Sequence, residues 1–437
     1  MRRGLLLFCV VSLFACAAAA QAPLLNATER GRAKKMLNEI KDTLRKEYYD
    51  KTFHGLDLNR HFKTAETKLD SAVSLGHAYA IIAQALIDLN DSHTFFIPPN
   101  RTASFEYGWK MQVVGDQCFV VAVKADSDAA AQGLKPGDRV LQYDAFVPQR
   151  DQLWKAEYLT HVLSPRRVLK VVVQSPGGAP RALEIAAKVT PRPREEIVTV
   201  DLSHGGSFSY ATGPRIETSR AARIGDLTIW KLGTFGFNPE DVDSMFDQVI
   251  EGAASLVLDL RGNPGGLVKT LEQFVGRLFD RDVKIADVEG RKSSKPSVAK
   301  THGRTFTGKL VLLVDSGSAS AAEVLARVVQ IEKRGTVVGD RTSGSVMQGV
   351  HHRFALEVPD NRDVVMILYG ASITDADLIL SDGHSLERVG VTPDEVVLPT
   401  AEDLRAGRDP ALSRAAAIVG GAIDPQHAGA IFPVEWK

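Results

Sequence analysis

The chain has 437 residues, which is long enough for two or three domains. Hydrophobic residues make up 44% and charged residues 24% of it, the ordinary balance of a soluble globular protein. Basic and acidic residues both number 53, so no overall charge draws the chain to nucleic acid or an anionic membrane, and we expect no nucleic-acid partner.

The first 20 residues have the pattern of a secretory signal. Arg2 and Arg3 precede an apolar run over 5–15, and small residues follow at 17–20. We expect cleavage after Ala20 and export to the periplasm or the exterior. No integral membrane span is expected, because about 20 apolar residues are needed to cross a bilayer and no run in the chain reaches that length.

The cysteines indicate neither a disulfide nor a lipid anchor. Cys9 and Cys16 lie in the signal, so only Cys118 remains in the mature chain. Bulky Phe14 makes the residues before Cys16 a poor lipidation site, which argues against an anchor there. Cys118 lies in an apolar, strand-like run and is interpreted as a buried structural thiol.

Residues 21–100 are predicted to form a helical region. Apolar residues recur at helical spacing from Asn26 or Thr28 to about Tyr48, and again over 75–89. The second helix ends at a polar turn that contains Asp91, Ser92 and His93, and a proline-containing loop follows.

Residues 101–190 change to strand and turn patterning. Within them, residues 126–131 and the run Gly-Leu-Lys-Pro-Gly-Asp-Arg-Val-Leu at 133–141 resemble the signature of a PDZ domain. PDZ domains bind an extended peptide as an added strand and hold its terminal carboxylate on backbone amides. The resemblance implies a carboxylate loop, and so a peptide-binding site, near Tyr107, Gly108 and Trp109. A PDZ fold that docks only against its own chain is the alternative.

A linker rich in Pro, Ser and Gly begins near residue 191 and leads to a predicted α/β core that extends to residue 400. Strands are predicted at 227–232, 255–260, 310–314 and 335–339, with helices at 239–252, 268–279 and 319–331. This alternation favours a sheet buried on both faces. The tail over 401–437 is expected to be irregular.

The segment 310–323 is the most informative part of the chain. An apolar strand breaks into Asp-Ser-Gly-Ser-Ala-Ser and then becomes an amphipathic helix, which places Ser320 at a helix start. Backbone amides there are unpaired and favour negative charge, so a serine can attack a carbonyl while neighbouring amides hold the oxyanion. The alternative is structural, because Ser320 and Glu323 also fit a capping box.

A glycine-rich turn strengthens the catalytic interpretation. Residues 259–266 read Asp-Leu-Arg-Gly-Asn-Pro-Gly-Gly, between a buried strand and a helix. Together with Ser320, the PDZ signature and Glu-Arg-Val-Gly-Val-Thr-Pro-Asp at 387–394, this turn resembles the C-terminal-processing and tricorn-type serine peptidases. The resemblance covers roughly residues 75–400. It implies a Clp/crotonase-like α/β core with an inserted, mostly β PDZ domain.

The resemblance also implies the catalytic residues. In the processing branch the nucleophile would be Ser320 and a Lys would be its base, but Ser345 stands where that Lys is expected. A hydroxyl whose pKa lies far above neutrality cannot replace it. The tricorn-type branch uses His and Glu instead, and Ser92 and His93 stand at the matching place.

By resemblance, Glu387 would orient His93, and Ser92 would support the site through a hydrogen bond. Asp375, Asp377 and Asp382 are alternatives for the carboxylate. The oxyanion donors would be the amides of Ala321 and of Gly265 or Gly266.

Several of these residues also have simpler interpretations. Asp91 could cap a turn without His93 being catalytic, Glu387 could be a surface residue, and His351 and His352 are interpreted as structural, although His351 could approach the cleft. No cluster has metal-ligand spacing, so neither a metal nor another cofactor is expected.

The sequence therefore predicts an exported serine endopeptidase that hydrolyses extended or unfolded polypeptides, selected through their C-termini by the PDZ domain. One rival is a catalytically silent protein that binds a peptide or an apolar ligand on the same fold, which the missing Lys favours. Another is a PDZ-anchored adaptor. If the peptidase hypothesis is right, His93 and Ser320 converge.

Overall fold

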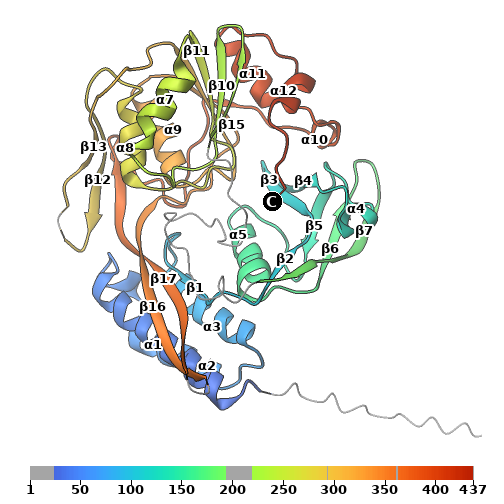
Figure 1. Ribbon diagram of the computed structural model, residues 1–437, viewed down its shortest axis with the longest axis vertical. Coiled ribbons are helices and arrows are strands. Elements are labelled where there is room, and N and C mark those ends of the chain that lie inside the picture. The colour runs from blue at the N-terminus through green and yellow to red at the C-terminus, as the bar shows by residue number, and fades with distance from the viewer. Residues whose placement is uncertain (1–23, 193–218, 293, 361–362, 437) are drawn as a thin grey trace, which may run out of the picture.

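The computed structural model describes residues 24–192, 219–292, 294–360 and 363–436 (Figure 1). The expected signal at 1–20 and most of the expected linker lie outside these ranges. Within them, none of the helices combines the length and the apolar character needed to cross a membrane.

Three helices begin the described chain: α1 (Ala27–Glu47), α2 (Leu58–Leu69) and α3 (Leu75–Ile87). Each begins where a polar N-cap side chain accepts a hydrogen bond from a first-turn amide, at Asn26, Asp57 and Ser74. Figure 1 shows the three packed around a long orange hairpin, β16 (Met347–Asp360) and β17 (Asp363–Leu380). The short strand β1 (Phe95–Ile97), which follows α3, pairs with β17. This pairing places the turn after α3 beside β17, a strand that follows most of the α/β core in the sequence.

The middle of the chain forms a five-stranded antiparallel sheet in the order β3-β4-β5-β6-β7. Its elements are β3 (Trp109–Val114), β4 (Gln117–Val123), α4 (Asp128–Ala131), β5 (Arg139–Tyr143), α5 (Leu153–Glu157), a π-helix (Tyr158–Leu163), β6 (Val168–Gln174) and β7 (Pro180–Ala186). A two-stranded ribbon of β2 (Ala103–Glu106) and β8 (Lys188–Pro191) joins it to the rest of the molecule.

The α/β core is a six-stranded sheet in the order β18-β15-β14-β11-β10-β9, in which only the edge strand β9 runs antiparallel to its neighbour. The strands are β9 (Ser219–Ile224), β10 (Leu227–Leu232), β11 (Ser255–Asp259), β14 (Lys309–Val314), β15 (Thr336–Gly339) and β18 (Glu395–Val396). The helices α7 (Asp241–Ile250), α8 (Val268–Gly276) and α9 (Ala321–Ile331) cover one face. Strands β12 (Val283–Gly290) and β13 (Ser297–Ala299) extend the sheet that holds β17.

The central strands are apolar throughout because both faces of the sheet are buried. Leu256 and Leu258 of β11 belong to the core under α7, α8 and α9, whereas Val257 belongs to a second core on the opposite face. Adjacent residues of a strand point to opposite faces, so a continuous apolar run fills both cores at once.

The expectation of an irregular C-terminal tail is wrong. The tail contains α10 (Ala401–Ala406), α11 (Pro410–Ile418) and α12 (Pro425–Ile431), and α11 and α12 cover the second face of the core sheet. Thr400, Asp409 and Asp424 cap these helices, and Pro410 and Pro425 stand in the first turn, where a missing amide costs nothing. The many Ala, Gly and Pro residues favoured an irregular segment, although the helices they form are short and well capped.

The five-stranded sheet docks directly on the loops at the carboxyl ends of the core strands. Gln112 Nε2 donates to Asp315 Oδ2 at 2.6 Å, just after β14. Arg150 Nη2 forms a 2.7 Å ion pair with Asp340 Oδ2, just after β15. The same Asp340 oxygen accepts from the Gly115 amide at 2.9 Å. These contacts tie the sheet to the segments on either side of Ser320.

Candidate active site

Ser320 occupies a strained position between β14 and α9. Its backbone angles are φ 52° and ψ −118°, a region that residues other than glycine rarely adopt. It is the N-cap residue of α9, yet its side chain makes no capping hydrogen bond. A sharp strand-to-helix turn of this kind holds the serine hydroxyl at the top of the sheet in the nucleophile elbow of α/β-hydrolases.

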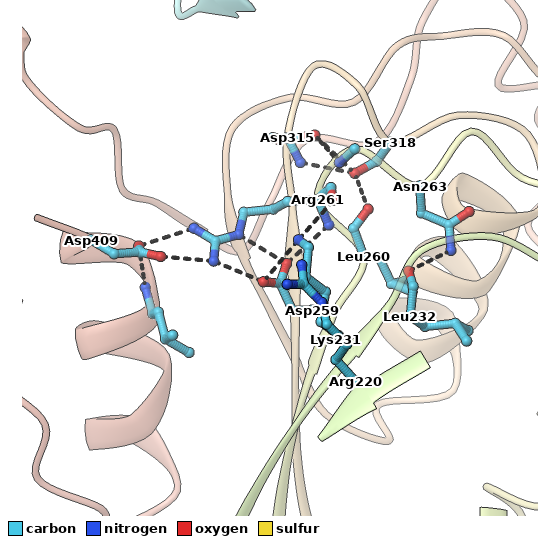
Figure 2. Close-up of polar contacts among 12 residues, drawn as sticks. Arg220, Lys231, Leu232, Asp259, Leu260, Arg261, Asn263, Asp315, Ser318 and Asp409 are labelled. Atoms are coloured by element: carbon cyan, nitrogen blue, oxygen red, sulfur yellow. Dashed lines mark hydrogen bonds and ion pairs between the residues drawn. The ribbon is translucent and has the colours of Figure 1, made fainter. Parts of the chain in front are cut away.

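The turn that carries Ser320 is attached to the glycine-rich turn beside it. Asp315 Oδ1 accepts from the Gly262 amide at 2.8 Å, and Ser318 Oγ donates to the Leu260 carbonyl at 2.8 Å. The Ala319 amide donates to the Asn263 carbonyl at 2.9 Å. Figure 2 shows the Asp315, Ser318 and Leu260 contacts at the ends of β11 and β14. These hydrogen bonds tie the two turns together.

An ion pair between Arg261 and the buried Asp259 holds the start of the glycine-rich turn. Arg261 binds both oxygens of Asp259 and also reaches Asp409, which caps α11 (Figure 2). Burial opposes ionisation of Asp259, but the charges of Arg261 and Lys231 outweigh it and hold the pKa of this carboxyl well below its ordinary range. The pair fixes the start of the turn at the end of β11.

Gly265 lies directly against Ser320. A Cβ atom at Gly265 would lie 2.6 Å from Ser320 Cβ, and the residue has φ +95°, so only glycine fits here. Its amide donates to Asn263 Oδ1 at 2.8 Å, and its carbonyl accepts from the Phe235 amide at 2.7 Å. Among the described residues, the amides of Gly266 and Ala321 have no hydrogen-bond partner.

The turn that contains His93 forms a hydrogen-bonded chain with Glu387. Ser92 Oγ lies 2.8 Å from His93 Nδ1 and donates to Glu387 Oε2 at 2.7 Å, while the Ser92 amide donates to Glu387 Oε1 at 2.8 Å. Because the Ser92 hydroxyl donates its proton to the carboxylate, it accepts from Nδ1–H of the imidazole. Nε2 of His93 then carries the lone pair, and no described residue is bonded to it.

His93 is 8% exposed, and its environment keeps it neutral at physiological pH. Burial lowers the pKa of His93 to about 4, against the opposing effect of Asp91 and with a small further contribution from His351. Burial also raises the pKa of Glu387, although its hydrogen bonds from Ser92 and Val346 oppose the shift. Gly349 leaves room for the histidine, since a Cβ there would lie 3.2 Å from His93 Cβ.

One loop connects the Ser320 turn to the His93 turn. The Val346 amide donates to Glu387 Oε2 at 2.9 Å, and the preceding Ser345 carbonyl accepts from the Ser320 amide at 2.9 Å. The carbonyl and the amide of the single peptide unit between Ser345 and Val346 thus contact the two halves of the site. Among the described residues, no direct hydrogen bond joins Ser320 to His93.

Sequence reasoning assigned Glu323 only a capping role, and the structure gives it a larger one. Its carboxylate is fully buried and accepts from the amides of Ser320, Gly344 and Ser345 and from the Thr342 hydroxyl. Burial raises the pKa of Glu323 to about 7, against these hydrogen bonds. A glutamate in the first turn of a helix was visible in the sequence, but its partners in the 342–345 loop were not.

The other candidate carboxylates lie elsewhere. Asp375 accepts from Gln348 Nε2, Asp377 accepts from the Ser385 hydroxyl, and Asp382 forms an ion pair with Arg327. None of these three is bonded to His93 within the described residues. His351 lies beside Phe95, with ring centroids 6.2 Å apart, and its Nε2 is buried without a partner in the described part of the chain.

The predicted carboxylate loop lies at the edge of the five-stranded sheet. Tyr107 is 4% exposed, and its hydroxyl donates to the Arg166 carbonyl at 2.9 Å. Gly108 has φ +72° and packs against Ser127, where a Cβ atom would collide with its side chain. Trp109 begins the edge strand β3. The Tyr107 side chain is therefore part of the domain core, whereas Trp109 is partly buried.

Metal ligands do not gather in the described ranges: no group of three His, Cys, Asp or Glu side chains there could hold an ion. Cys118 is buried, and burial raises the pKa of its thiol to about 12.

Comparisons with known proteins agree with this architecture. Residues 223–397 match peptidase family S41. The carboxyl-terminal-processing protease of Synechocystis sp. is 26% identical over 333 residues, covering 73% of this chain and 70% of that protein. The chloroplastic C-terminal processing peptidase of Tetradesmus obliquus is 27% identical over 381 residues, covering 81% of this chain and 75% of that protein.

Solved structures share the fold at lower identity. Mature CPAF superposes with a TM-score of 0.61 at 16% identity, covering 87% of this chain and 95% of that chain. The photosystem II D1 C-terminal processing protease superposes with a TM-score of 0.50 at 21% identity, covering 85% and 94%. The match of residues 223–397 to peptidase family S41 and the likeness to carboxyl-terminal-processing proteases support a serine protease, which acts on polypeptides, while the solved structures show the same fold.

Proposed function

We propose that this chain is an exported serine endopeptidase in which Ser320 is the nucleophile and His93 is the general base. The observation that carries the proposal is the chain Glu387–Ser92–His93, which ends in an unbonded Nε2 and whose carboxylate is bound by Val346, next to the Ser345 carbonyl that accepts from the Ser320 amide. A neutral histidine whose tautomer is fixed by a carboxylate is suited to accept a serine proton.

In the proposed reaction, His93 acts first as a base and then as an acid. Ser320 Oγ attacks the scissile carbonyl carbon while its proton passes to His93 Nε2, and the imidazolium keeps its other proton on Nδ1 toward Ser92. The tetrahedral intermediate collapses when His93 returns the proton to the leaving amine, which leaves an acyl-enzyme. A water molecule then attacks the ester, with His93 again accepting a proton, and Ser320 is released with the carboxylic acid product.

Hydrogen bonding favours Gly266 over Gly265 as an oxyanion donor. The Gly265 amide is occupied by Asn263, and the Gly265 carbonyl points to Phe235. In a trans peptide the next amide points the opposite way, so the Gly266 N–H faces away from Phe235. Together with the Ala321 amide at the start of α9, it would supply two donors to the developing negative charge.

Position 345 holds a serine where a lysine base is expected, and this is compatible with the proposed mechanism. Ser345 contributes through its backbone, because its amide binds Glu323 and its carbonyl binds the Ser320 amide. The base comes instead from the turn after α3, a different part of the chain. The Ser–Lys mechanism is therefore replaced rather than damaged, which is the reason to prefer the peptidase over a silent binding protein.

We further propose that substrates are extended polypeptides, held in part by a PDZ-like module over 101–190. The support is the edge strand β3, next to the main-chain groups of Tyr107, Gly108 and Trp109, because an edge strand can pair with an added peptide strand. Selection by C-terminus, and export directed by the first 20 residues, belong to the same proposal.

Labelling with a fluorophosphonate probe tests the nucleophile and the base. We expect the purified mature protein to be labelled and Ser320→Ala and His93→Ala to be unlabelled. Ser343→Ala is the matched control, because Ser343 lies in the neighbouring loop and bonds only the Ser345 side chain and the Ser318 carbonyl. A folded wild type that is never labelled would refute the proposal and favour the silent binding protein.

A second assay tests the substrate. Reduced, carboxymethylated casein should be cleaved, and a peptide with a free C-terminus should be cleaved faster than its C-terminal amide. Equal rates for the two peptides would remove selection by C-terminus while leaving the peptidase intact.

A further inference from the structure

We propose that Asp91 is a positioning residue for catalysis, a second carboxylate that holds the His93 turn and supports positive charge on the imidazole. The inference rests on the proposed role of His93 and adds a residue to it. Glu387 acts on His93 through the Ser92 hydroxyl, whereas Asp91 acts through the backbone of the turn and through its own charge.

Asp91 binds the turn that carries His93. Its Oδ1 accepts from the His93 amide at 2.9 Å and from the Thr94 amide at 2.7 Å. These two bonds fix the direction in which the backbone leaves α3, and with it the direction of the imidazole. A turn-capping aspartate would stop at these bonds.

Asp91 also joins the turn to two other elements. Thr374 of β17 donates its hydroxyl to Oδ1, and Tyr48, the C-cap residue of α1, donates to Oδ2 at 2.8 Å. Thr94 and Thr374 bind each other as well, through the Thr94 hydroxyl. The His93 turn is therefore held at a fixed place between α1 and the sheet that contains β17.

The charge of Asp91 is not neutralised by any described cation. Asp91 is 5% exposed, and all four donors to its carboxyl group are neutral groups. No ion pair to Asp91 exists among the side chains that the structure describes. A buried, uncompensated negative charge two residues from His93 favours the imidazolium that forms during the reaction.

Other charged and titratable groups surround this site. Arg388 donates to the Asn90 carbonyl and Arg291 to the Tyr48 carbonyl, so both cations bind main-chain oxygens rather than Asp91. Glu387 faces His93 through Ser92, His351 faces it from β16, and Tyr48 and Tyr49 face Asp91 from the end of α1. Burial, followed by Asp91, raises the pKa of both tyrosines far above neutrality, so they stay protonated. His54 closes the network at the surface, with Nε2 3.0 Å from the Tyr48 hydroxyl.

Asp91→Asn separates charge from geometry. The amide oxygen can keep the bonds from the His93 and Thr94 amides, and the amide nitrogen can donate to Tyr48, whose hydroxyl can then donate to His54. Thr374→Val removes the hydrogen bonds of its hydroxyl to Asp91 and to Thr94 and leaves the charge of Asp91 in place. Tyr48→Phe is a second variant, which leaves the carboxylate with one donor fewer and should strengthen its field at His93.

The experiment measures the rate of fluorophosphonate labelling as a function of pH for the mature protein and its variants. We expect Asp91→Asn to label up to about tenfold more slowly on the plateau, with its acid limb displaced to lower pH by about one unit. Thr374→Val and Tyr48→Phe, which each take one hydroxyl donor from the carboxylate and leave its charge, should both move the limb to higher pH, opposite to Asp91→Asn. A merely structural role would lower the rate without moving the limb.

The outcomes separate the two proposals. If His93→Ala is labelled like the wild type, the assignment of the base falls and the role of Asp91 falls with it. If His93→Ala is silent but the limb of Asp91→Asn coincides with that of the wild type, only the role of Asp91 is refuted. If Asp91→Asn does not fold, an unmoved limb in Tyr48→Phe refutes it instead.

Discussion

Replacing Gly265 by alanine should disable the site through two effects, backbone strain at Gly265 and a steric clash with Ser320. The position has φ +95°, which costs a non-glycine residue about 1–3 kcal/mol. The new Cβ would also lie 2.6 Å from Ser320 Cβ and 2.9 Å from both the Ala319 carbonyl oxygen and the Ala321 nitrogen. Relieving these contacts costs about 1–3 kcal/mol more and must move the nucleophile or the turn.

Gly262→Ala separates the two effects. Gly262 belongs to the same turn and has φ +68°, but a Cβ there would meet nothing within 4 Å. We therefore expect Gly262→Ala to lose stability through strain alone. A nucleophile displaced by about 1 Å loses on the order of a hundredfold in rate, so Gly265→Ala should label that much more slowly than Gly262→Ala. Fluorophosphonate labelling and thermal unfolding measure both quantities. Labelling of Gly265→Ala within threefold of Gly262→Ala would refute the placement of Ser320 against Gly265.

Three further predictions concern carboxylates and their partners. Glu387→Gln should reduce labelling by about 10²-fold or more with little loss of folding, because the carboxylate that fixes the His93 tautomer is gone; unchanged labelling would contradict its role. The pKa of Glu323 is raised to about 7 in the folded protein, so its contribution to stability is fully present below the unfolded pKa of 4.5 and is lost as the pH rises through about 7. The free energy of unfolding of the wild type, measured in urea, should therefore fall by about 3 kcal/mol over this pH window. In Glu323→Gln the same free energy should stay nearly constant with pH. Arg150→Ala leaves Asp340 without its ion-pair partner between the five-stranded sheet and the core, and should lower the stability by about 3 kcal/mol in calorimetry, whereas Arg167→Ala on the exposed surface should not.

Local sequence patterns were sufficient for much of the fold. The helices α1 and α3 begin at N-caps that the sequence displays, and their apolar residues keep helical spacing to within two residues of the observed ends. The central strands of the core were predicted because burial on both faces demands unbroken apolar runs. The C-terminal helices were missed because each spans at most nine residues, too few for a clear apolar period.

Contacts between distant parts of the chain could not be derived from local patterns. Ser92 and Glu387 are 295 positions apart, and their meeting depends on the pairing of β1 with β17. The family resemblance suggested this pair, but nothing in either segment by itself specifies the partner. The same holds for the network of Asp91, because its donors Tyr48 and Thr374 lie 43 and 283 positions away.

A serine is tolerated at position 345 because the loop that contains it contacts the site through backbone groups. Two consecutive amides, of Ser345 and Val346, bind Glu323 and Glu387, so the loop holds both the nucleophile helix and the carboxylate of the histidine chain. A lysine base in such a site must lose its proton through burial, and its side chain would arrive from this loop. The proposed base, His93, is kept neutral by burial, which lowers its pKa, and it comes from the turn after α3. Residue 345 then needs only to form its two main-chain hydrogen bonds, and these do not depend on which side chain it carries.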